Sequence, residues 1–332
     1  MTVIRIGRIM VGALAGSPEI SICIVNTNGR AMLLACLESI FANPPSGDFE
    51  VLVLDNASDD GSGAAVKVEY GDRVGLVELE RRRGKAENDS HLMALAKGRF
   101  LLLLNEDSEL TSSAADALAQ ALEEAPRAAA AGARMVDEQG RARPSAWRFP
   151  GLVTALAGVV FAHRLATVQS RGERTRPVDW VQSAGMLIRK EAFDEVGPMD
   201  PAFFVYSDEV DWQKRAHDSG WSVIYVPEAR IIHREQLSSG AAVEPRIVEF
   251  SRNRDRYMRK HHGPVAAALV RGLTAITYAL RALAALVLPG RSAGRYLTHA
   301  RSSLSPDHGS GLREAAEAYN RQLDAVERGA RR

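Results

Sequence analysis

The sequence has very few cysteines and almost no net charge. Its two cysteines, Cys23 and Cys36, lie thirteen residues apart in a chain of 332 residues. Such a pair fits neither a disulfide framework nor a zinc knuckle, so we expect a reducing compartment. The 42 Lys and Arg residues are balanced by 41 Asp and Glu residues, which leaves a formal charge of +1. The chain as a whole lacks the basic footprint of a nucleic-acid-binding protein, and that class is disfavoured.

Other signals are also missing. Arg5 and Arg8 interrupt the apolar residues at the start of the chain, so a secretory signal is not expected, and we interpret residues 1–18 as a leader arm. No Gly-x-Gly-x-x-Gly turn follows the apolar run Ile20–Val25, which argues against a dinucleotide-binding fold. No internal repeat is found. The length allows one large α/β domain with an appendage, or two domains.

Short apolar runs alternate with helical patterns along most of the chain. The regular alternation favours parallel strands in succession, which is typical of an α/β fold. Segment 141–175 is less regular and rich in Arg and Pro. The expected strands are 19–28, 49–54, 74–79, 100–104, 130–136, 186–188 and 222–226, and the expected helices are 31–42, 89–97, 112–125, 190–196 and 209–219.

Two acidic clusters directly follow apolar strands. Asp55 ends one strand and begins a turn-rich segment that runs to Ser62. Asn105, Glu106 and Asp107 follow a run of four leucines. In open α/β sheets, ligands bind beyond the carboxyl ends of the strands, and carboxylate and amide oxygens suit Mg²⁺ or Mn²⁺ shared with a diphosphate. An ordinary turn at the first cluster and a solvated loop at the second are the structural alternatives.

A third cluster stands before an expected helix. Asp208, Glu209 and Asp211 follow an aromatic stretch, Phe203–Tyr206. Acids at a helix start also favour the helix dipole, which is the structural alternative. A carboxylate held against apolar side chains has a raised pKa and can accept a proton from a hydroxyl group.

The region 251–301 has a different character, because ten Lys and Arg residues there are opposed only by Asp255. Within it, Pro264–Leu288 is apolar, but Arg271 and Arg281 would each cost about 2.5–3.5 kcal/mol at the centre of a bilayer. A spanning helix is therefore not expected. An in-plane amphipathic helix or hairpin at an anionic surface and a helical pair packed on protein, including a second subunit, both fit the pattern.

Several segments together resemble family 2 glycosyltransferases. They occur in order and at the family's intervals over residues 19–240, and the combination is similar to a bacterial rhamnosyltransferase-like branch. The segments are ISICIVNTNG (20–29), VLDNASDDGS (53–62), LLLLNED (101–107), GMLIRKEAFDEVG (185–197), 199–221 and VPEARIIH (226–233). The resemblance implies a GT-A fold, with a mostly parallel sheet flanked by helices, over 19–240 and a helical, basic C-terminal extension over 241–332.

The resemblance also implies an activity and a set of donor-binding residues. The activity is inverting transfer of a sugar, with rhamnose as the family-level guess, from a nucleotide-diphosphate donor to a hydroxyl of a glycan or lipid-linked acceptor in cell-surface polysaccharide assembly. The family's nucleoside-binding positions fall on Thr27, Asn28 and Asp55. Asn88 lies where the family has a loop near the donor. Lys85, three residues earlier, either meets a phosphate or belongs to a solvated loop.

The family's metal and base positions can also be transferred. Its D-x-D metal motif falls on residues 105–107. Asp107 is then the ligand of Mg²⁺ or Mn²⁺, and Asn105 and Glu106 lie beside the donor. His233 matches a histidine that approaches the metal in related enzymes. The family's acidic pair falls on Asp208 and Glu209 in reversed order, so Glu209 is the expected catalytic base and Asp208 the reserve.

The altered acidic pair leaves a second hypothesis open, a non-catalytic scaffold protein at the membrane. The remaining expectations are a cytoplasmic location, peripheral attachment to the inner face of the cell membrane through residues 251–301, and a homo-oligomer.

Overall fold

The computed structural model describes residues 17–234, 243–287, 290 and 292–330. The leader arm therefore lies almost entirely outside the described residues, and so does the expected domain boundary at 240/241. The boundaries of the three expected parts stay a prediction.

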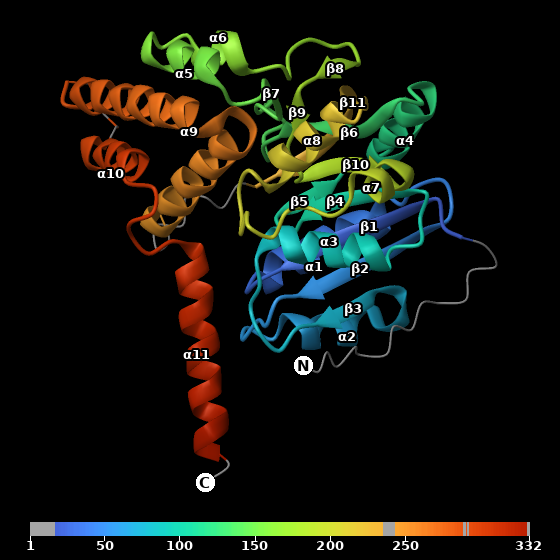
Figure 1. Cartoon of the computed structure of the whole chain (residues 1–332). Helices are drawn as coiled ribbons and strands as arrows, with labels where there is room; N and C mark the ends of the chain where they lie inside the picture. Colours follow the sequence, from blue (N-terminus) through green and yellow to red (C-terminus); the bar gives the residue numbers. More distant parts are fainter. Residues whose placement is uncertain (1–16, 235–242, 288–289, 291, 331–332) are drawn as a thin grey trace.

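A nine-stranded, mostly parallel sheet forms the core (Figure 1). The strand order is β3-β2-β1-β4-β10-β6-β11-β5, and β8 pairs with β11; β5, β8 and β10 run antiparallel to their neighbours. A short β7-β9 ribbon lies beside it. The strands are β1 (Ile20–Asn26), β2 (Phe49–Asp55), β3 (Gly75–Glu78), β4 (Phe100–Asn105), β5 (Ser108–Leu110), β6 (Ala128–Val136), β7 (Ala146–Trp147), β8 (Arg176–Val178), β9 (Trp180–Val181), β10 (Gly185–Arg189) and β11 (Ser222–His233).

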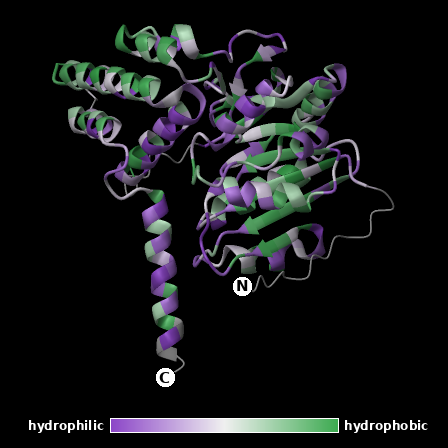
Figure 2. Cartoon of the chain, viewed as in Figure 1, coloured by the Kyte–Doolittle hydropathy of each residue, from purple (hydrophilic) through white to green (hydrophobic). Residues whose placement is uncertain are grey.

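Helices cover both faces of the sheet, which is why the central strands are continuous apolar runs. One core cluster joins the sheet to α1, α2 and α4, and a second joins its other face to α3, α7 and α8. Figure 2 shows the strands as a hydrophobic centre between these helices. The helices of this part are α1 (Arg30–Ala42), α2 (Ser62–Tyr70), α3 (Lys85–Leu95), α4 (Ala114–Glu124), α7 (Lys190–Val196) and α8 (Asp208–Asp218).

The strand order reverses at β1. Strand β1 pairs with β2 on one side and with β4 on the other, and α1 and α3 pack on opposite faces of the sheet. Such a reversal opens a crevice at the carboxyl ends of the strands, where ligands bind in doubly wound folds. The crevice therefore lies where β1, β2 and β4 end, at Asn26, Asp55 and Asn105.

The C-terminal region is helical, as the sequence indicates. Helix α9 (Val243–Ala285) bends at Gly263, where φ is +82°, and is followed by α10 (Ala293–Leu304) and α11 (Leu312–Ala330). Among the described residues, α9 is the one helix that is long and apolar enough to cross a membrane by length and composition. Its second half packs instead against α10 and against α5 (Leu152–Val159). With α6 (His163–Thr167), α5 gives segment 141–175 more regular structure than the sequence indicates.

Candidate functional site

The loops that follow β1 and β2 are fastened to each other. The amide nitrogen of Asn26 donates to Asp55 Oδ1 at 2.9 Å, and the backbone N–H of Ser58 donates to Asp55 Oδ2 at 3.2 Å. Asp55 is buried, with 6% of its surface exposed. One carboxylate oxygen thus joins the two loops and the other holds the turn after β2, and the predicted contact with a nucleoside would come in addition to these roles.

Thr27 and Asn28 lie exposed on the rim of the crevice. The Thr27 hydroxyl accepts from the amide nitrogen of Asn56 at 3.1 Å. Asn28 has a left-handed backbone, with φ of +56°, and its side chain exchanges two hydrogen bonds of 2.8 and 2.9 Å with Asp59. The loop is therefore held in a fixed shape, which is what a preformed binding edge requires.

The two predicted metal ligands, Asp107 and His233, meet at the end of the sheet. Strand β5 pairs with the end of β11, and His233 Nε2 lies 3.2 Å from Asp107 Oδ1. The His233 Nδ1 atom is buried and has no hydrogen-bond partner. A carboxylate and an imidazole suit Mn²⁺ or Mg²⁺ when diphosphate oxygens and waters complete the shell, so this donor pair fits such an ion. Within the described part of the chain, no three His, Cys, Asp or Glu side chains form a complete metal cluster.

Glu106 lies beside this pair, near the start of α1. A Cβ atom on Gly29 would come within 3.0 Å of the Glu106 side chain, so the absence of a side chain there makes room for it. Burial, and then the neighbouring Asp107 carboxylate, raises the pKa of Glu106 to about 7. Its neighbour Asn105 is half-buried and pairs with Val25 at the end of β4.

Asp208 and Glu209 begin α8 on the other side of the crevice. Burial, and then the Asp208 carboxylate, raises the pKa of Glu209 well above its usual range. Asp208 is 1% exposed, and neither of its carboxylate oxygens has a hydrogen-bond partner. A buried acid with both oxygens unpartnered, directly beside Glu209, suits a bound ligand or water.

The structure adds Lys85 to this site. Lys85 is the first residue of α3, is half-buried, forms an ion pair with Asp89 and lies 3.3 Å from the Ser183 hydroxyl. Burial alone would lower the pKa of Lys85, but Asp89, Asp208 and Glu209 together raise it. The interpretation of this segment as a solvated loop is therefore wrong.

Lys85 connects the two halves of the crevice. Its positive charge acts on Glu106 on one side and on Glu209 on the other. Its backbone N–H donates to the Phe204 carbonyl at 2.6 Å, and Gly84 allows this approach because a Cβ there would lie 2.7 Å from the same oxygen. The segment before α8 is thus brought onto the start of α3, and Lys85 acts on Glu106 and on the Asp208–Glu209 pair together.

Asn88 follows Lys85 on the same helix. It is 1% exposed, and neither its amide oxygen nor its amide nitrogen has a hydrogen-bond partner. Buried amides in folded proteins nearly always have partners, so this side chain suits a bound ligand or water. Its place near the donor stays a prediction.

Asp211, the other acid of the third cluster, has a structural role. It is fully buried and accepts bonds from His261 at 2.8 Å, Lys260 at 2.8 Å and Arg215 at 3.0 Å. Burial alone would raise the pKa of Asp211, but these three donors hold it below its usual value. Because two of them belong to α9, Asp211 fastens the C-terminal region to α8.

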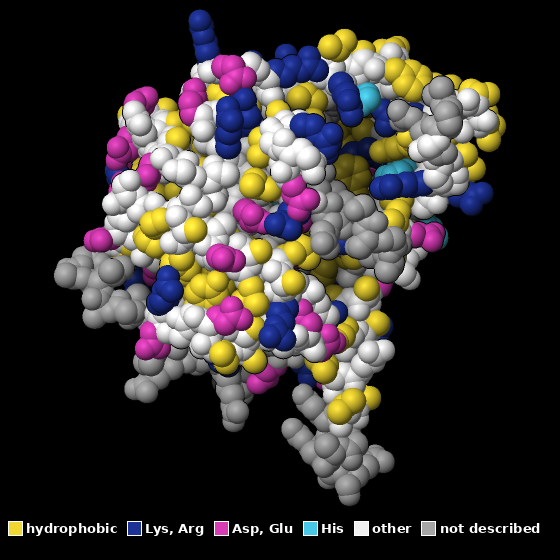
Figure 3. Space-filling view, turned by 180° about the vertical axis from the view of Figure 1, so that it is seen from behind, with side chains coloured by type: hydrophobic (Ala, Val, Ile, Leu, Met, Phe, Trp, Pro, Cys, Tyr) yellow, Lys and Arg dark blue, Asp and Glu magenta, His cyan; other side chains and the backbone are white. Residues whose placement is uncertain are grey.

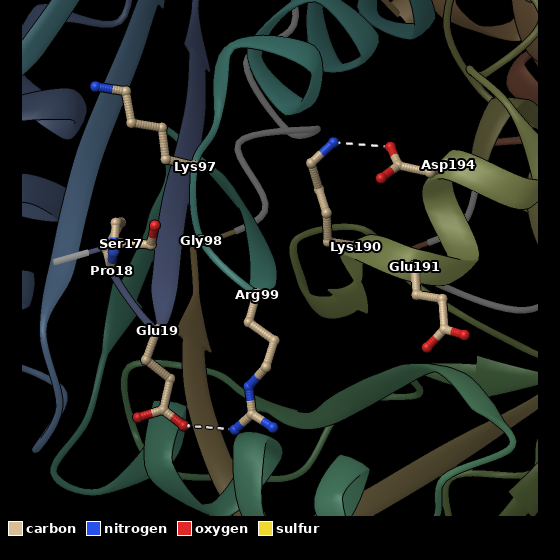
Figure 4. A pocket seen from close by; sticks show the side chains of 9 residues that line it. All are labelled: Ser17, Pro18, Glu19, Lys97, Gly98, Arg99, Lys190, Glu191 and Asp194. Atoms are coloured by element: carbon tan, nitrogen blue, oxygen red, sulfur yellow. Dashed lines mark hydrogen bonds and ion pairs between the residues drawn. The ribbon is translucent and has the colours of Figure 1, made fainter.

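A second hollow lies at the opposite edge of the sheet, where β1 and β4 begin (Figure 4). Four of its six charged side chains are paired with one another: Arg99 contacts Glu19 at 3.0 Å, and Lys190 contacts Asp194 at 2.8 Å. It lies at the amino ends of the parallel strands, away from the edge where such folds bind ligands. The carboxyl-end crevice is therefore the candidate site.

Comparisons with known proteins find a matching family model and several relatives. The family model "Glycosyl transferase family 2" matches residues 21–197. A Mycobacterium tuberculosis protein named N-acetylglucosaminyl-diphospho-decaprenol L-rhamnosyltransferase is 33% identical over 149 residues, which are 42% of this chain and 48% of that protein. The O-antigen biosynthesis protein RfbC of Myxococcus xanthus is 25% identical over 69% of this chain and 18% of its own length. The chain thus spans half or less of the length of these curated relatives.

A solved structure shows the same fold. The mannosyltransferase PcManGT of Pyrobaculum calidifontis, in complex with GDP-Man and Mn²⁺, matches with a TM-score of 0.56 and 15% identity over 92% of this chain and 89% of its own. The likeness confirms the GT-A fold that the resemblance implies. The family match ends at residue 197, before Asp208, Glu209 and His233, so the roles of these residues stay predictions.

Proposed function

Because the chain belongs to glycosyl transferase family 2, we propose that it transfers a sugar from a nucleoside diphosphate donor to an acceptor hydroxyl, with inversion at the anomeric carbon. The observation that carries the proposal is the position of Lys85, which acts on Glu106 beside the Asp107–His233 pair and on the Asp208–Glu209 pair. This position supports a diphosphate site and a proton acceptor on one crevice, which is the arrangement that a displacement at a sugar carbon needs.

The residues divide into a donor side and an acceptor side. Thr27, Asn28 and the loop held by Asp55 would receive the nucleoside, with Asn88 and Asn105 nearer the sugar and the diphosphate. Asp107 and His233 would hold a divalent cation, Mg²⁺ or Mn²⁺. When bound, such an ion neutralises charge on the departing diphosphate.

Glu209 is the proposed base. Its raised pKa makes it a better proton acceptor than an ordinary carboxylate, and the Lys85 cation keeps a fraction of it ionised. The acceptor oxygen forms a bond to the anomeric carbon while the bond from that carbon to the diphosphate breaks. The hydroxyl proton passes to Glu209. A single displacement with the base and the leaving group on opposite sides inverts the configuration.

The relatives suggest the substrates. The mycobacterial relative is named for rhamnosyl transfer to a diphospho-decaprenol-linked sugar, and the Myxococcus relative for O-antigen biosynthesis. We therefore propose a deoxythymidine-diphosphate rhamnose donor and a lipid-linked glycan acceptor in cell-surface polysaccharide assembly. Such an acceptor places the enzyme at the inner face of the cell membrane.

A panel of nucleotide sugars tests the proposal. The full chain is incubated with each sugar, with Mn²⁺, Mg²⁺ or a chelator, and its melting temperature is measured. A ligand present at about 100 times its Kd stabilises the folded state by about 2.7 kcal/mol, so a true donor should raise the melting temperature only with the cation. The same donor should then release its nucleoside diphosphate when a lipid-linked acceptor is added. Binding without any transfer would favour the non-catalytic scaffold, and no binding of any sugar nucleotide would overturn the donor site.

A further inference from the structure

The exposed hydrophobic side chains are gathered in one part of the molecule. Among residues whose side chains are described, eighteen large hydrophobic ones are exposed, and fifteen of these lie on or directly beside α5, α6, the second half of α9 and α10. We call these four elements the helical layer. Figure 2 shows it as a second concentration of hydrophobic residues beside the one in the sheet. Patches of this kind mark an interaction surface.

The apolar residues form stripes without a partner. On the second half of α9 they fall on one face of the helix and are 37–73% exposed. The opposite face of the same helix is buried against α5 and α10. The exposed stripe consists of Val265, Leu269, Ile276, Leu280 and Leu283. On and just after α5, Leu152, Val153, Leu156 and Val160 form a similar stripe. A helix with one stripe buried and a second one exposed has a further surface to cover.

The charge of the helical layer is of one sign. No Asp or Glu occurs between residues 139 and 172 or between 256 and 306, whereas Arg164, Arg271, Arg281, Arg295 and Arg301 lie on these elements. Figure 3 shows Lys, Arg and His side chains among the hydrophobic ones on the upper right of the molecule, over these helices. An anionic surface complements this composition, whereas a second copy of the layer would bring cations against cations.

A pocket with two arginines lies between α5 and α9. Arg281 lies over Tyr278 and contacts the His163 ring at 3.2 Å, and Arg254 donates to Ser303 at 3.1 Å. Within the part of the chain that the structure describes, no carboxylate lies within ion-pair distance of either arginine. The nearest acid along the helix, Asp255, is paired with Arg259 and Arg271. Half-buried guanidinium groups without an acidic partner are suited to a phosphate, which they can bind with two parallel hydrogen bonds.

We propose that the helical layer docks on the surface of an anionic phospholipid bilayer, with its exposed stripes in the acyl boundary and a lipid phosphate in the pocket of Arg254 and Arg281. An in-plane helix places its apolar stripe toward the acyl chains and its arginines at the level of the phosphates, and Arg271 and Arg281 lie away from the exposed stripe of α9. A spanning orientation would bury these arginines in hydrocarbon and separate α9 from α5. The proposal does not rest on glycosyl transfer.

Vesicle sedimentation with the full chain tests the apolar stripe. We compare vesicles of phosphatidylcholine alone with vesicles of equal parts of phosphatidylcholine and phosphatidylglycerol. The protein should bind the mixed vesicles more strongly. Leu269→Asn and Leu283→Asn should each weaken that binding by about fivefold, because each removes roughly a kilocalorie of apolar transfer. The matched control is Val68→Asn, which removes an exposed hydrophobic side chain from α2 and should leave binding unchanged.

Charge-neutral variants test the pocket. Arg254→Gln and Arg281→Gln should each reduce the preference for mixed vesicles by about fivefold. Arg321→Gln, an exposed arginine on α11, is the matched control and should have no effect. Inorganic phosphate should raise the melting temperature of the unmodified protein, relative to chloride of equal ionic strength, and should raise that of the two pocket variants less. Circular dichroism shows whether the variants are folded.

Three outcomes would overturn the proposal. The docking surface is wrong if the unmodified protein stays in solution with mixed vesicles. The docking surface is also wrong if light scattering shows a dimer that does not bind vesicles and that the leucine variants convert to a monomer. The exposed stripe is then a contact between two copies of the chain. The phosphate site is wrong if inorganic phosphate stabilises the pocket variants as much as the unmodified protein.

Discussion

Replacing Glu209 with glutamine tests the proposed base directly. Glutamine has nearly the volume of glutamate and keeps one oxygen as a hydrogen-bond acceptor, but it cannot take up a proton at pH 7. The half-buried site at the start of α8 should therefore stay packed. The proposed donor site lies on the loops after β1, β2 and β4, so donor binding should remain near normal.

The size of the effect follows from the role of the group. General-base assistance contributes about 10²–10⁴-fold to a rate, which corresponds to about 3–5 kcal/mol of barrier. The structure favours the upper part of this range, because burial and the Asp208 carboxylate raise the pKa of Glu209 and so make it a stronger base than an ordinary carboxylate. Turnover should fall by about 10³-fold or more while the concentration of donor needed for half-saturation changes little.

The pH profile gives a second and independent measurement. Glu209 must be ionised to act, so turnover should rise with pH through its raised pKa. Asp208→Asn removes the like charge, which lowers the pKa of Glu209 and moves the acid limb of the profile to lower pH. Lys85→Met removes the opposing cation and should move the same limb to higher pH.

The assay is continuous release of nucleoside diphosphate at saturating donor and acceptor, with melting temperatures to confirm folding. Near-normal turnover in Glu209→Gln would remove this residue from the role of base. Asp208→Asn and Lys85→Met shifting the limb in the same direction would also refute the reasoning, because it requires their charges to act on Glu209 with opposite sign.

Three other changes should give distinct results. Asp107→Asn should weaken the affinity for the donor in the presence of the cation by about tenfold, without unfolding the chain, and the rise in melting temperature on adding donor and cation should be smaller. An unchanged response to the cation would reject the role of Asp107 as a ligand. Asp211→Asn should lower the free energy of unfolding by about 1–3 kcal/mol in urea titration, because it removes the buried carboxylate that joins Arg215 of α8 to Lys260 and His261 of α9. A loss below about 0.5 kcal/mol would mean that this contact between α8 and α9 is not stabilising. Gly84→Ala should lower the free energy of unfolding by about 1–3 kcal/mol and reduce turnover, because the added Cβ would meet the Phe204 carbonyl oxygen. Full activity and stability would show that the close contact between Gly84 and Phe204 is not needed.

The strands of the crevice were predictable because they are buried on both faces. Runs such as Phe100–Leu104 carry no helical period and end in polar residues, and parallel strands bring such ends to one edge of a sheet. This places Asp55 and Asp107 at the crevice without knowledge of the fold. The meeting of Asp107 with His233 depends on the pairing of β5 with β11, and the sequence gives no sign of the three-residue strand β5.

The first turn of α3 could not be recognised from its pattern. Its inward face carries Asn88 and Asp89, so polar residues occupy positions where a periodic helix has apolar ones. A usable signal was present, because Lys85 and Asp89 are four residues apart and can pair on one helix face. Asp211 posed the opposite problem: it stands among the acids expected at the site, but its partners Lys260 and His261 lie about fifty residues further along the chain.

Helix α5 was missed for a related reason. Its outward face is apolar, so the residues that would normally mark the solvent side of an amphipathic helix are hydrophobic, and the segment around it is rich in Arg and Pro. A pattern that assumes water on one side does not predict such a helix.

The C-terminal region is part of the machinery that positions the proposed base. Tyr206 and Ser207, directly before Asp208, both have left-handed backbones, with φ of +67° and +64°, which cost about 1–3 kcal/mol each for residues other than glycine. Such a conformation persists only when the surroundings impose it. Asn253 on α9 donates to the Val205 carbonyl at 2.8 Å, on the residue before Tyr206, and Asp211 ties the same two helices one turn later. Docking of α9 on a membrane would therefore also affect the position of the segment that carries Glu209. The attachment of the chain and the geometry of its crevice are connected in this way.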